Sequence, residues 1–280
     1  MRHTVHQNRS MMVTELALGF AVGAIMALTG AGGGILAVPV LMFGLQLNVS
    51  QAGPVGLMAV GLAATLGAAA ALPAGTVRYR AAILMSVSGM LLSPLGIWLS
   101  HRTDGRWLAI LFSLLLFFVA YRSFRHARKQ SQFNVQGAAG QAQEPTCLQN
   151  PRSGRFVWTA RCMRALVLAG GIAGFFSGLL GVGSGFIIVP ALQHFTGLAM
   201  QSVIATSLTV IALVSWTGVL FNYTSGSLDM DTALPFCTGA MAGMLAGRFM
   251  PHWLTEFQVQ ISFAVLSAVV ATGMLLFSFA

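Results

Sequence analysis

One glycine-rich stretch occurs twice in the chain, and each copy interrupts a long apolar run. The first copy spans residues 30–41 and reads GAGGGILAVPVL; the second spans residues 181–192 and reads GVGSGFIIVPAL. Glycine allows the left-handed and strained backbone conformations that a tight reversal needs, and it lets other groups approach closely. Each copy therefore predicts a break in a helix that otherwise consists of apolar residues.

The apolar runs around these breaks are about 20 residues long and carry no charge, which is the length of a helix that crosses a bilayer. Hydrophobic residues make up 56% of the chain and charged residues only 8%. Soluble proteins, in contrast, carry roughly 25% charged residues. We therefore expect an all-α integral membrane protein that crosses the cytoplasmic membrane several times.

The net charge of the chain is +9, which in a soluble protein would suggest binding to nucleic acid. In a membrane protein the same excess is explained by Lys and Arg residues that accumulate in cytoplasmic loops. Eight of the fifteen Lys and Arg residues lie between Arg122 and Arg164. We interpret residues 122–164 as a polar cytoplasmic linker, and we expect no nucleic-acid partner.

Sliding the sequence by 151 residues (181 − 30) superposes the two glycine-rich stretches without a gap. The same offset pairs further residues outside these stretches. They include Gly19/Gly170, Gly67/Gly218, Gly75/Gly226, Gly96/Gly247 and His101/His252. Because one offset holds over about a hundred residues, the sequence predicts two homologous halves. Membrane repeat 1 is expected at residues 13–121 and membrane repeat 2 at residues 165–280.

Each half is expected to contain the same series of segments. An apolar segment ends at the glycine break, a segment of about eleven residues follows that is too short to span, and three segments of spanning length complete the half. In the first half the segments are 13–29, 35–45, 49–72, 81–100 and 107–121. In the second half they are 166–180, 186–195, 203–223, 232–250 and 257–279.

The charges of two equivalent turns bear on how the halves are oriented. The turn after Gly75 carries Arg78 and Arg80, whereas the turn after Gly226 carries Asp229 and Asp231. Parallel halves would place both turns in the cytoplasm, while an inverted repeat places the acidic turn outside. The pattern favours an inverted repeat, which is common in secondary transporters. This arrangement needs an odd number of crossings per half, which a re-entrant helix pair plus three spanning helices supplies.

A break in a membrane helix leaves backbone N–H and C=O groups unpaired, which is costly against lipid. Such breaks therefore lie where protein or a wet cavity surrounds them. The short segment after each break begins with free N–H groups at the positive end of a helix dipole, which favours an anion. In the second copy Ser184 replaces Gly33, and its hydroxyl either caps the short helix or contacts a substrate.

The alternative interpretation is that small residues only allow helices to pack closely. We favour this interpretation for the small residues that precede the breaks. These residues are Gly19, Gly23, Ala27, Gly170, Gly174 and Gly178. For the breaks themselves we favour a functional role, because two equivalent interruptions in apolar segments of membrane length are typical of a transporter's binding site.

Two further features add polar groups to this picture. Thr206 and Ser207 lie just inside the helix that begins near Val203, and they either donate to an oxyanion or bond to their own helix backbone. Arg248 ends an apolar segment and either reaches the membrane interface or supplies a positive charge to an anion. The candidate substrate-binding residues are Gly30, Gly32, Gly33, Gly34, Gly181, Gly183, Ser184, Gly185, Thr206, Ser207 and Arg248.

The sequence offers no pattern typical of an enzyme, a metal site or a cofactor. Cys147, Cys162 and Cys237 show no paired spacing, and we interpret them as ordinary residues. No Lys-Ser or Lys-Thr pair follows the glycines, so a phosphate-binding loop is not expected. Because no nucleotide-binding motif is present, transport energy would have to come from a gradient, such as one of H⁺ or Na⁺, or from a partner.

The two glycine stretches each read G-x-G-x-G with V-P-x-L beyond, and in this respect the chain resembles the TauE/SafE family of sulfite exporter type. Residues 205–208, Gly226 before a polar turn, and the pair Gly247 and Arg248 support the resemblance. The resemblance implies a two-repeat permease for small anions, characteristically sulfur-containing ones such as sulfite or sulfoacetate.

The leading hypothesis is a secondary transporter that moves a small anion across the membrane by alternating access, with the lipid bilayer as its surroundings. A non-transporting membrane scaffold or assembly factor is the alternative, and it predicts breaks that are sealed by packing. A channel would need a continuous polar path, for which the chain has few polar residues. A homodimer is left open.

Overall fold

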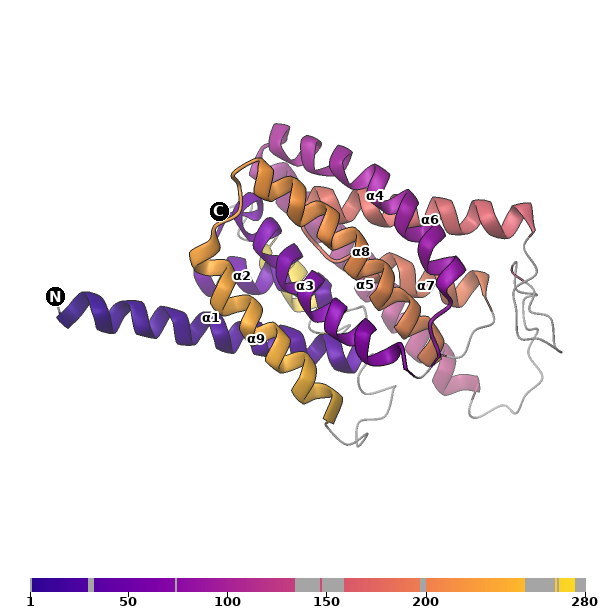
Figure 1. The fold of residues 1–280 in the computed structure, drawn as a ribbon, viewed down its shortest axis with the longest axis horizontal. Helices are drawn as coiled ribbons and strands as arrows, with labels where there is room; N and C mark the ends of the chain where they lie inside the picture. The colour runs from indigo at the N-terminus through magenta and orange to yellow at the C-terminus, as the bar shows by residue number, and fades with distance from the viewer. Residues whose placement is uncertain are drawn as a thin grey trace.

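The computed structural model describes residues 2–29, 33–73, 75–133, 147, 159–196, 200–249, 265 and 267–274. Almost all of these residues are helical, which confirms the expected all-α fold (Figure 1). The elements in chain order are α1 (Arg2–Thr29), the 3₁₀ helix η1 (Gly33–Leu36), α2 (Ala37–Leu45), α3 (Val49–Ala71), α4 (Tyr79–Arg102), α5 (Gly105–Phe133), α6 (Ala160–Leu180), α7 (Gly185–Phe195), α8 (Met200–Thr224) and α9 (Met230–Phe249).

Five of the described helices are long and apolar enough to cross a membrane. The candidate spans are Met12–Thr29, Val49–Ala71, Tyr79–Arg102, Ala160–Leu180 and Met200–Thr224. The helices α2 and α7 have nine and eleven residues. At a rise of 1.5 Å per residue they extend only about 14–17 Å, roughly half the hydrocarbon thickness of a bilayer. Both are therefore too short to span, as the sequence predicts.

The chain turns back on itself after α1. A methyl group at Gly33 would overlap the backbone of Met26, and one at Gly44 would overlap the side chain of Leu18. As the chain advances from Gly33 to Gly44, its contacts on α1 thus move back toward the start of α1. The elements η1 and α2 therefore return along α1, and together they form the break-and-return pair that the sequence predicts.

Two pairs of helices pack through glycine, and each pair joins the two halves of the chain. In the α1–α9 pair, Gly19 lies against the backbone of Phe236 and Gly23 against that of Ala240. In the α4–α6 pair, Gly174 lies against the backbone of Gly89. A side chain at any of these glycines would collide with backbone atoms. The interpretation of these small residues as packing positions is confirmed.

Two residues related by the 151-residue offset contact partners that are related by the same offset. Gly67 of α3 lies against Leu208 of α8, and Gly218 of α8 lies against Leu57 of α3. These contacts show that α3 and α8 run antiparallel, since the start of one lies beside the end of the other (Figure 1). Between them, the indole N–H of Trp216 donates to Thr65 Oγ1 at 3.0 Å, and these two residues are themselves 151 apart.

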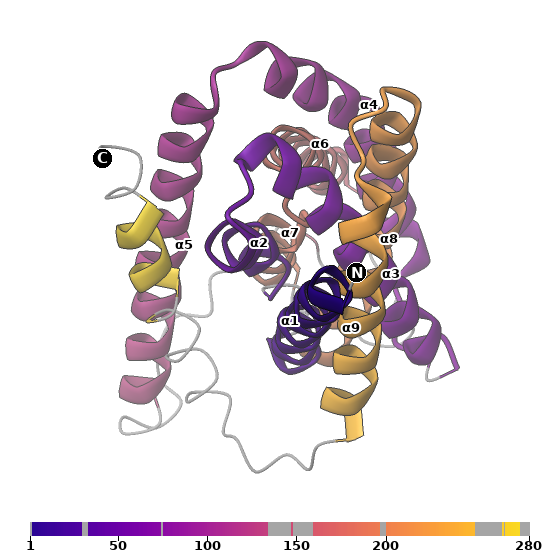
Figure 2. The ribbon, with the colours of Figure 1, turned by 90° about the vertical axis from the view of Figure 1, so that its left-hand side faces the viewer.

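The segment expected at 107–121 belongs to a longer helix. The helix α5 continues to Phe133, beyond the expected end of membrane repeat 1 at residue 121, and stands at the edge of the bundle (Figure 2). Residues 134–146 and 148–158 of the expected linker, and most of the expected segment 257–279, lie outside the described residues.

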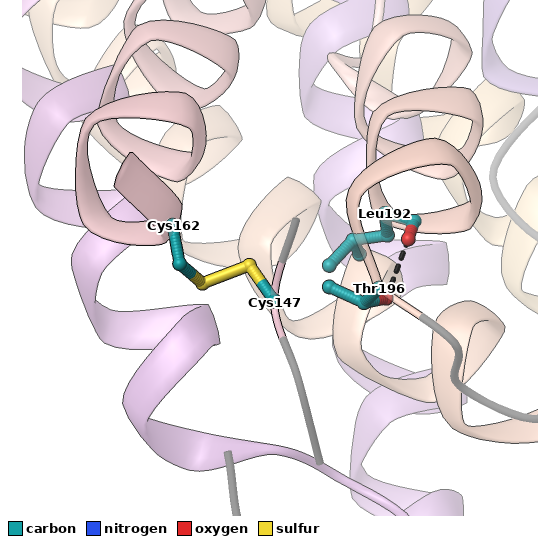
Figure 3. Close-up of a disulfide and its surroundings, with 4 residues drawn as sticks. All are labelled: Cys147, Cys162, Leu192 and Thr196. Atoms are coloured by element: carbon teal, nitrogen blue, oxygen red, sulfur yellow. Dashed lines mark hydrogen bonds between the residues drawn. A yellow bond between two sulfur atoms is a disulfide. The ribbon is translucent and has the colours of Figure 1, made fainter. Parts of the chain in front are cut away.

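Cys147 and Cys162 form a disulfide, so their interpretation as ordinary unpaired residues was wrong (Figure 3). The Cys147 N–H donates to the carbonyl of Phe195 at 2.9 Å, which holds this residue beside the end of α7. The two cysteines are 15 residues apart in the sequence, and no spacing motif marks a pairing that depends on how the chain folds back. Cys237 is a free, buried thiol.

Candidate functional site

The second helix break has a defined backbone. At the end of α6, Gly181 adopts a left-handed conformation with φ 66°, and its N–H donates to the carbonyl of Ser177 at 2.9 Å. Val182 and Gly183 are irregular, and α7 begins at Gly185. The residues from Gly181 to Gly185 are all buried. The predicted break is therefore present, and it lies inside the protein and away from the lipid.

The first break can be followed only in part, because Gly30 and Gly32 lie outside the described residues. Thr29 Oγ1 donates to the carbonyl of Ile25 at 2.8 Å and accepts the N–H of Gly33 at 2.9 Å, so one backbone amide of this break is satisfied by a side chain. A methyl group on Gly34 would lie 3.7 Å from the Cα atom of Gly183. The two breaks thus meet in the interior.

Apolar side chains surround the meeting point. Gly183 lies against Val60 of α3 and Ile211 of α8, which are also 151 residues apart. Gly181 lies so close to Gly53 of α3 that a side chain at Gly181 would collide with the Gly53 backbone. The surroundings therefore have a low dielectric constant, in which hydrogen bonds and dipoles act more strongly than in water.

Ser184 is the polar side chain at this break. It precedes α7, is fully buried and makes no side-chain cap bond. Its carbonyl accepts the N–H of Ile188 at 3.2 Å, but its hydroxyl has no hydrogen-bond partner in the described part of the chain. The Ser184 hydroxyl therefore does not cap α7, and contact with a substrate is the other role that the sequence leaves open. A buried hydroxyl without a partner costs about 1–3 kcal/mol, so this group is suited to a ligand or a water molecule.

Thr206 and Ser207 are used by the fold. Thr206 Oγ1 accepts the backbone N–H of Arg78 at 3.1 Å, and Ser207 Oγ donates to the carbonyl of Ile204 at 2.8 Å. Ser207 thus bonds to the backbone of its own helix, which is one of the two roles expected for it. The side chain that α8 places against the break is that of Ile211.

Arg78 is a candidate that sequence reasoning used only to orient the halves. Its Nε atom is buried and has no hydrogen-bond partner among the described residues, and its backbone holds the Thr206 hydroxyl. A charge beside the end of a membrane helix is already explained by loop topology, so the sequence gives no separate signal for it. Arg248, which the sequence suggested as the cation, belongs to α9, but its side chain lies outside the described residues.

A small pocket with both polar and apolar walls lies at the end of α6. Its lining includes Ser50, Ser100, His101, Asn222 and the last turn of α6 with Gly181. Its volume is about 10 Å³, room for roughly one water molecule. The pocket adjoins the start of α3, whereas Arg78 follows the end of α3. The pocket and Arg78 therefore lie at opposite ends of the helix bundle.

Comparison with known proteins agrees with this architecture. The model of the sulfite exporter TauE/SafE family matches residues 16–274. A probable membrane transporter protein of Xylella fastidiosa (strain 9a5c) is 30% identical over 249 residues, which cover 85% of this chain and 86% of the relative. The probable membrane transporter protein YunE of Bacillus subtilis is 26% identical over 249 residues, covering 82% of this chain and 85% of the relative.

No solved structure matches the chain. The family match spans both glycine breaks and, apart from the start of α1, all of the helices named above. The chain therefore belongs to the TauE/SafE sulfite exporter family of membrane transporters.

Proposed function

We propose that the protein is a secondary transporter that moves a small anion, a sulfur oxyanion or an organosulfonate such as sulfite or sulfoacetate, across the cytoplasmic membrane. The observation that carries this proposal is the buried hydroxyl of Ser184, which has no partner in the described chain and stands directly before α7. The Ser184 carbonyl accepts the N–H groups of Ile187 and Ile188. The N–H groups of Gly185 and Phe186, at the start of α7, have no carbonyl partner within their own helix, and they carry the positive end of its dipole.

These groups suit an oxyanion better than a cation or a neutral solute. Amide and hydroxyl donors bind oxygen acceptors, and donors aimed at an anion from a helix start need no charged side chain. The walls of the break are aliphatic, as Val60 and Ile211 show. In such surroundings an anion gains more from a few donors than it would in water.

The family name supports sulfur as the central atom of the substrate. The names of the relatives mention membrane transport without a substrate. Among sulfur anions, sulfite and sulfonates carry three oxygens on one sulfur, which matches a cluster of hydrogen-bond donors at one helix end.

The two halves are proposed to be an inverted repeat joined by residues 122–164. The antiparallel course of α3 and α8 and the equivalent neighbours of positions 151 apart support this arrangement. Because α1 packs on α9 and α6 on α4, the first helix of each half is bound to the other half. The units that move in alternating access are then the α1–α9 pair and the α4–α6 pair.

Flux into proteoliposomes tests this function. The assay compares sulfite, sulfoacetate, thiosulfate and sulfate, with neutral solutes as controls. Gly183→Leu fills the meeting point of the breaks, because a Cβ atom there already collides with Val60. It is expected to abolish anion flux. Gly105→Leu is the matched control, since a Cβ at Gly105 meets nothing within 4 Å. If no anion moves, or if Gly183→Leu transports normally, the proposal fails.

A non-transporting scaffold is the second candidate, and the apolar seal around Gly183 favours it. An occluded transporter shows the same seal at one stage of its cycle, so the seal alone does not decide. Folded protein that moves none of the anions in the panel would favour the scaffold.

A further inference from the structure

We propose that the small pocket at the end of α6 binds a monovalent cation of the size of Na⁺, whose gradient drives transport. This inference rests on the proposed function for its role in coupling, while the binding site itself can be tested alone. The pocket has oxygen-bearing groups from four helices: Ser50 of α3, Ser100 of α4, the last turn of α6, and Asn222 of α8.

The size of the pocket selects a small ligand. A volume of about 10 Å³ holds roughly one water molecule. A sulfite ion has four heavy atoms and needs several times that space. A bare monovalent cation comparable in size to water is therefore the kind of solute that fits without rearrangement.

The helix ends around the pocket favour positive charge. The helices α4, α6 and α8 all end at the pocket, and each contributes roughly −0.5 of an elementary charge from its C-terminal carbonyls. Only α3 begins there, and the Asn48 carbonyl already accepts the N–H groups of Gln51 at 3.0 Å and Ala52 at 2.8 Å. The Arg102 guanidinium lies over the Trp98 ring, 4.4 Å from its centre, so its charge is held on that ring.

The ligand atoms are of the type that a hard cation prefers. Oxygen donors from backbone carbonyls, amides and hydroxyls are its usual ligands. Beyond Ser177, whose carbonyl accepts Gly181 N–H, the carbonyls at the end of α6 have no amide of their own helix to bind. Unwound carbonyls and C-terminal helix ends of this kind coordinate cations in transporters with broken helices.

Asn222 is fixed in the orientation that such a site needs. It is only 4% exposed, and its Nδ2 group donates to the carbonyl of Gly218 at 2.9 Å. Its Oδ1 atom accepts the hydroxyl of Ser227 at 3.1 Å. Because the amide nitrogen is occupied, the oxygen is the atom of Asn222 that remains for a cation through its second lone pair.

The position of the pocket explains coupling. The last turn of α6 lines the pocket, and the start of α7 holds Ser184; only Val182 and Gly183 separate Gly181 from that serine. A cation at the end of α6 and an anion at the start of α7 attract each other across one short break. Binding of either therefore favours binding of the other, a coupling that is reciprocal by linkage.

Binding of ²²Na⁺ to the purified full-length protein, without any anion, tests the site directly. We expect saturable binding, and Asn222→Ala is expected to weaken it about tenfold, since one oxygen ligand to a charged group is lost. Ser215→Ala is the matched control on α8, because Ser215 is also buried but lies against Gly61. It should bind ²²Na⁺ like the parent protein.

Anion flux with Na⁺ replaced by choline separates this inference from the proposed function. Flux that falls at least severalfold in choline, and in Asn222→Ala at low Na⁺, supports the inference. Flux that is unchanged in choline, together with no saturable ²²Na⁺ binding, overturns the inference and leaves the anion transporter standing. Saturable ²²Na⁺ binding without flux of any anion supports the site and overturns the proposed function.

Discussion

Replacing Ser184 by alanine should make the protein more stable and a poorer transporter. The hydroxyl is fully buried and has no partner within the described chain. Removing such a group relieves part of a penalty of about 1–3 kcal/mol. For a chain of 280 residues, a gain of about 1 kcal/mol raises the melting temperature by roughly 2 °C. The same hydroxyl donates to the anion in the proposed site, and a hydrogen bond to a charged group contributes about 1.5–3 kcal/mol.

The half-saturating anion concentration of Ser184→Ala should therefore rise about ten- to a hundredfold. Thermal unfolding in detergent measures the first effect, and concentration-dependent flux in proteoliposomes measures the second. Ser215→Ala again serves as the control, because its hydroxyl is also buried without a partner in the described residues. It should gain stability but keep normal transport. A Ser184→Ala protein that is less stable than the parent, or that transports with unchanged affinity, would refute the reasoning.

Three further predictions follow from named contacts. Arg78→Gln should lower anion flux about tenfold because it removes a half-buried cation whose Nε atom has no hydrogen-bond partner among the described residues. Arg80→Gln, at an exposed position two residues away, should not; equal effects in a flux assay would exclude a specific role for Arg78. Gly174→Ala should lose about 1–3 kcal/mol of stability because its Cβ would collide with the Gly89 backbone. Gly171→Ala, where the nearest atom is 3.5 Å away on Leu92, should keep the stability of the parent protein. Thermal unfolding compares the two variants. In an inverted repeat, a cysteine at the exposed position Ser225 should react with an impermeant thiol reagent only from outside, and one at exposed Tyr79 only from the cytoplasm; labelling of Ser225→Cys from the cytoplasm would contradict the inverted arrangement.

Local sequence predicts most of the helices of this fold. The segment expected at 49–72 is the helix Val49–Ala71, and the one expected at 81–100 is Tyr79–Arg102. Length and lack of charge suffice here, since a membrane helix satisfies its own backbone. The second glycine break also appears where the sequence places it, because Gly181 needs a positive φ that other residues rarely adopt.

Features that depend on distant contacts are not visible in the sequence. The Cys147–Cys162 disulfide requires residues of the central segment to return to the start of α6. The bond from the Arg78 amide to Thr206 joins residues 128 positions apart. The pocket beside Asn222 gathers residues from four helices. None of these pairings has a periodic or spaced pattern, so only the packing of the helices reveals them.

The hydrogen bond between Trp216 and Thr65 has a mechanical consequence. In the proposed inverted repeat, two residues at equivalent positions can touch only near the axis that relates the halves, and Trp216 and Thr65 are 151 positions apart. A symmetric exchange of conformation between the halves leaves points on the axis where they are. Outer helices would travel furthest in such an exchange, while the middle of α3 and α8 would stay still. In this proposed transport cycle, the Trp216–Thr65 contact is the expected fixed point about which the outer helices move.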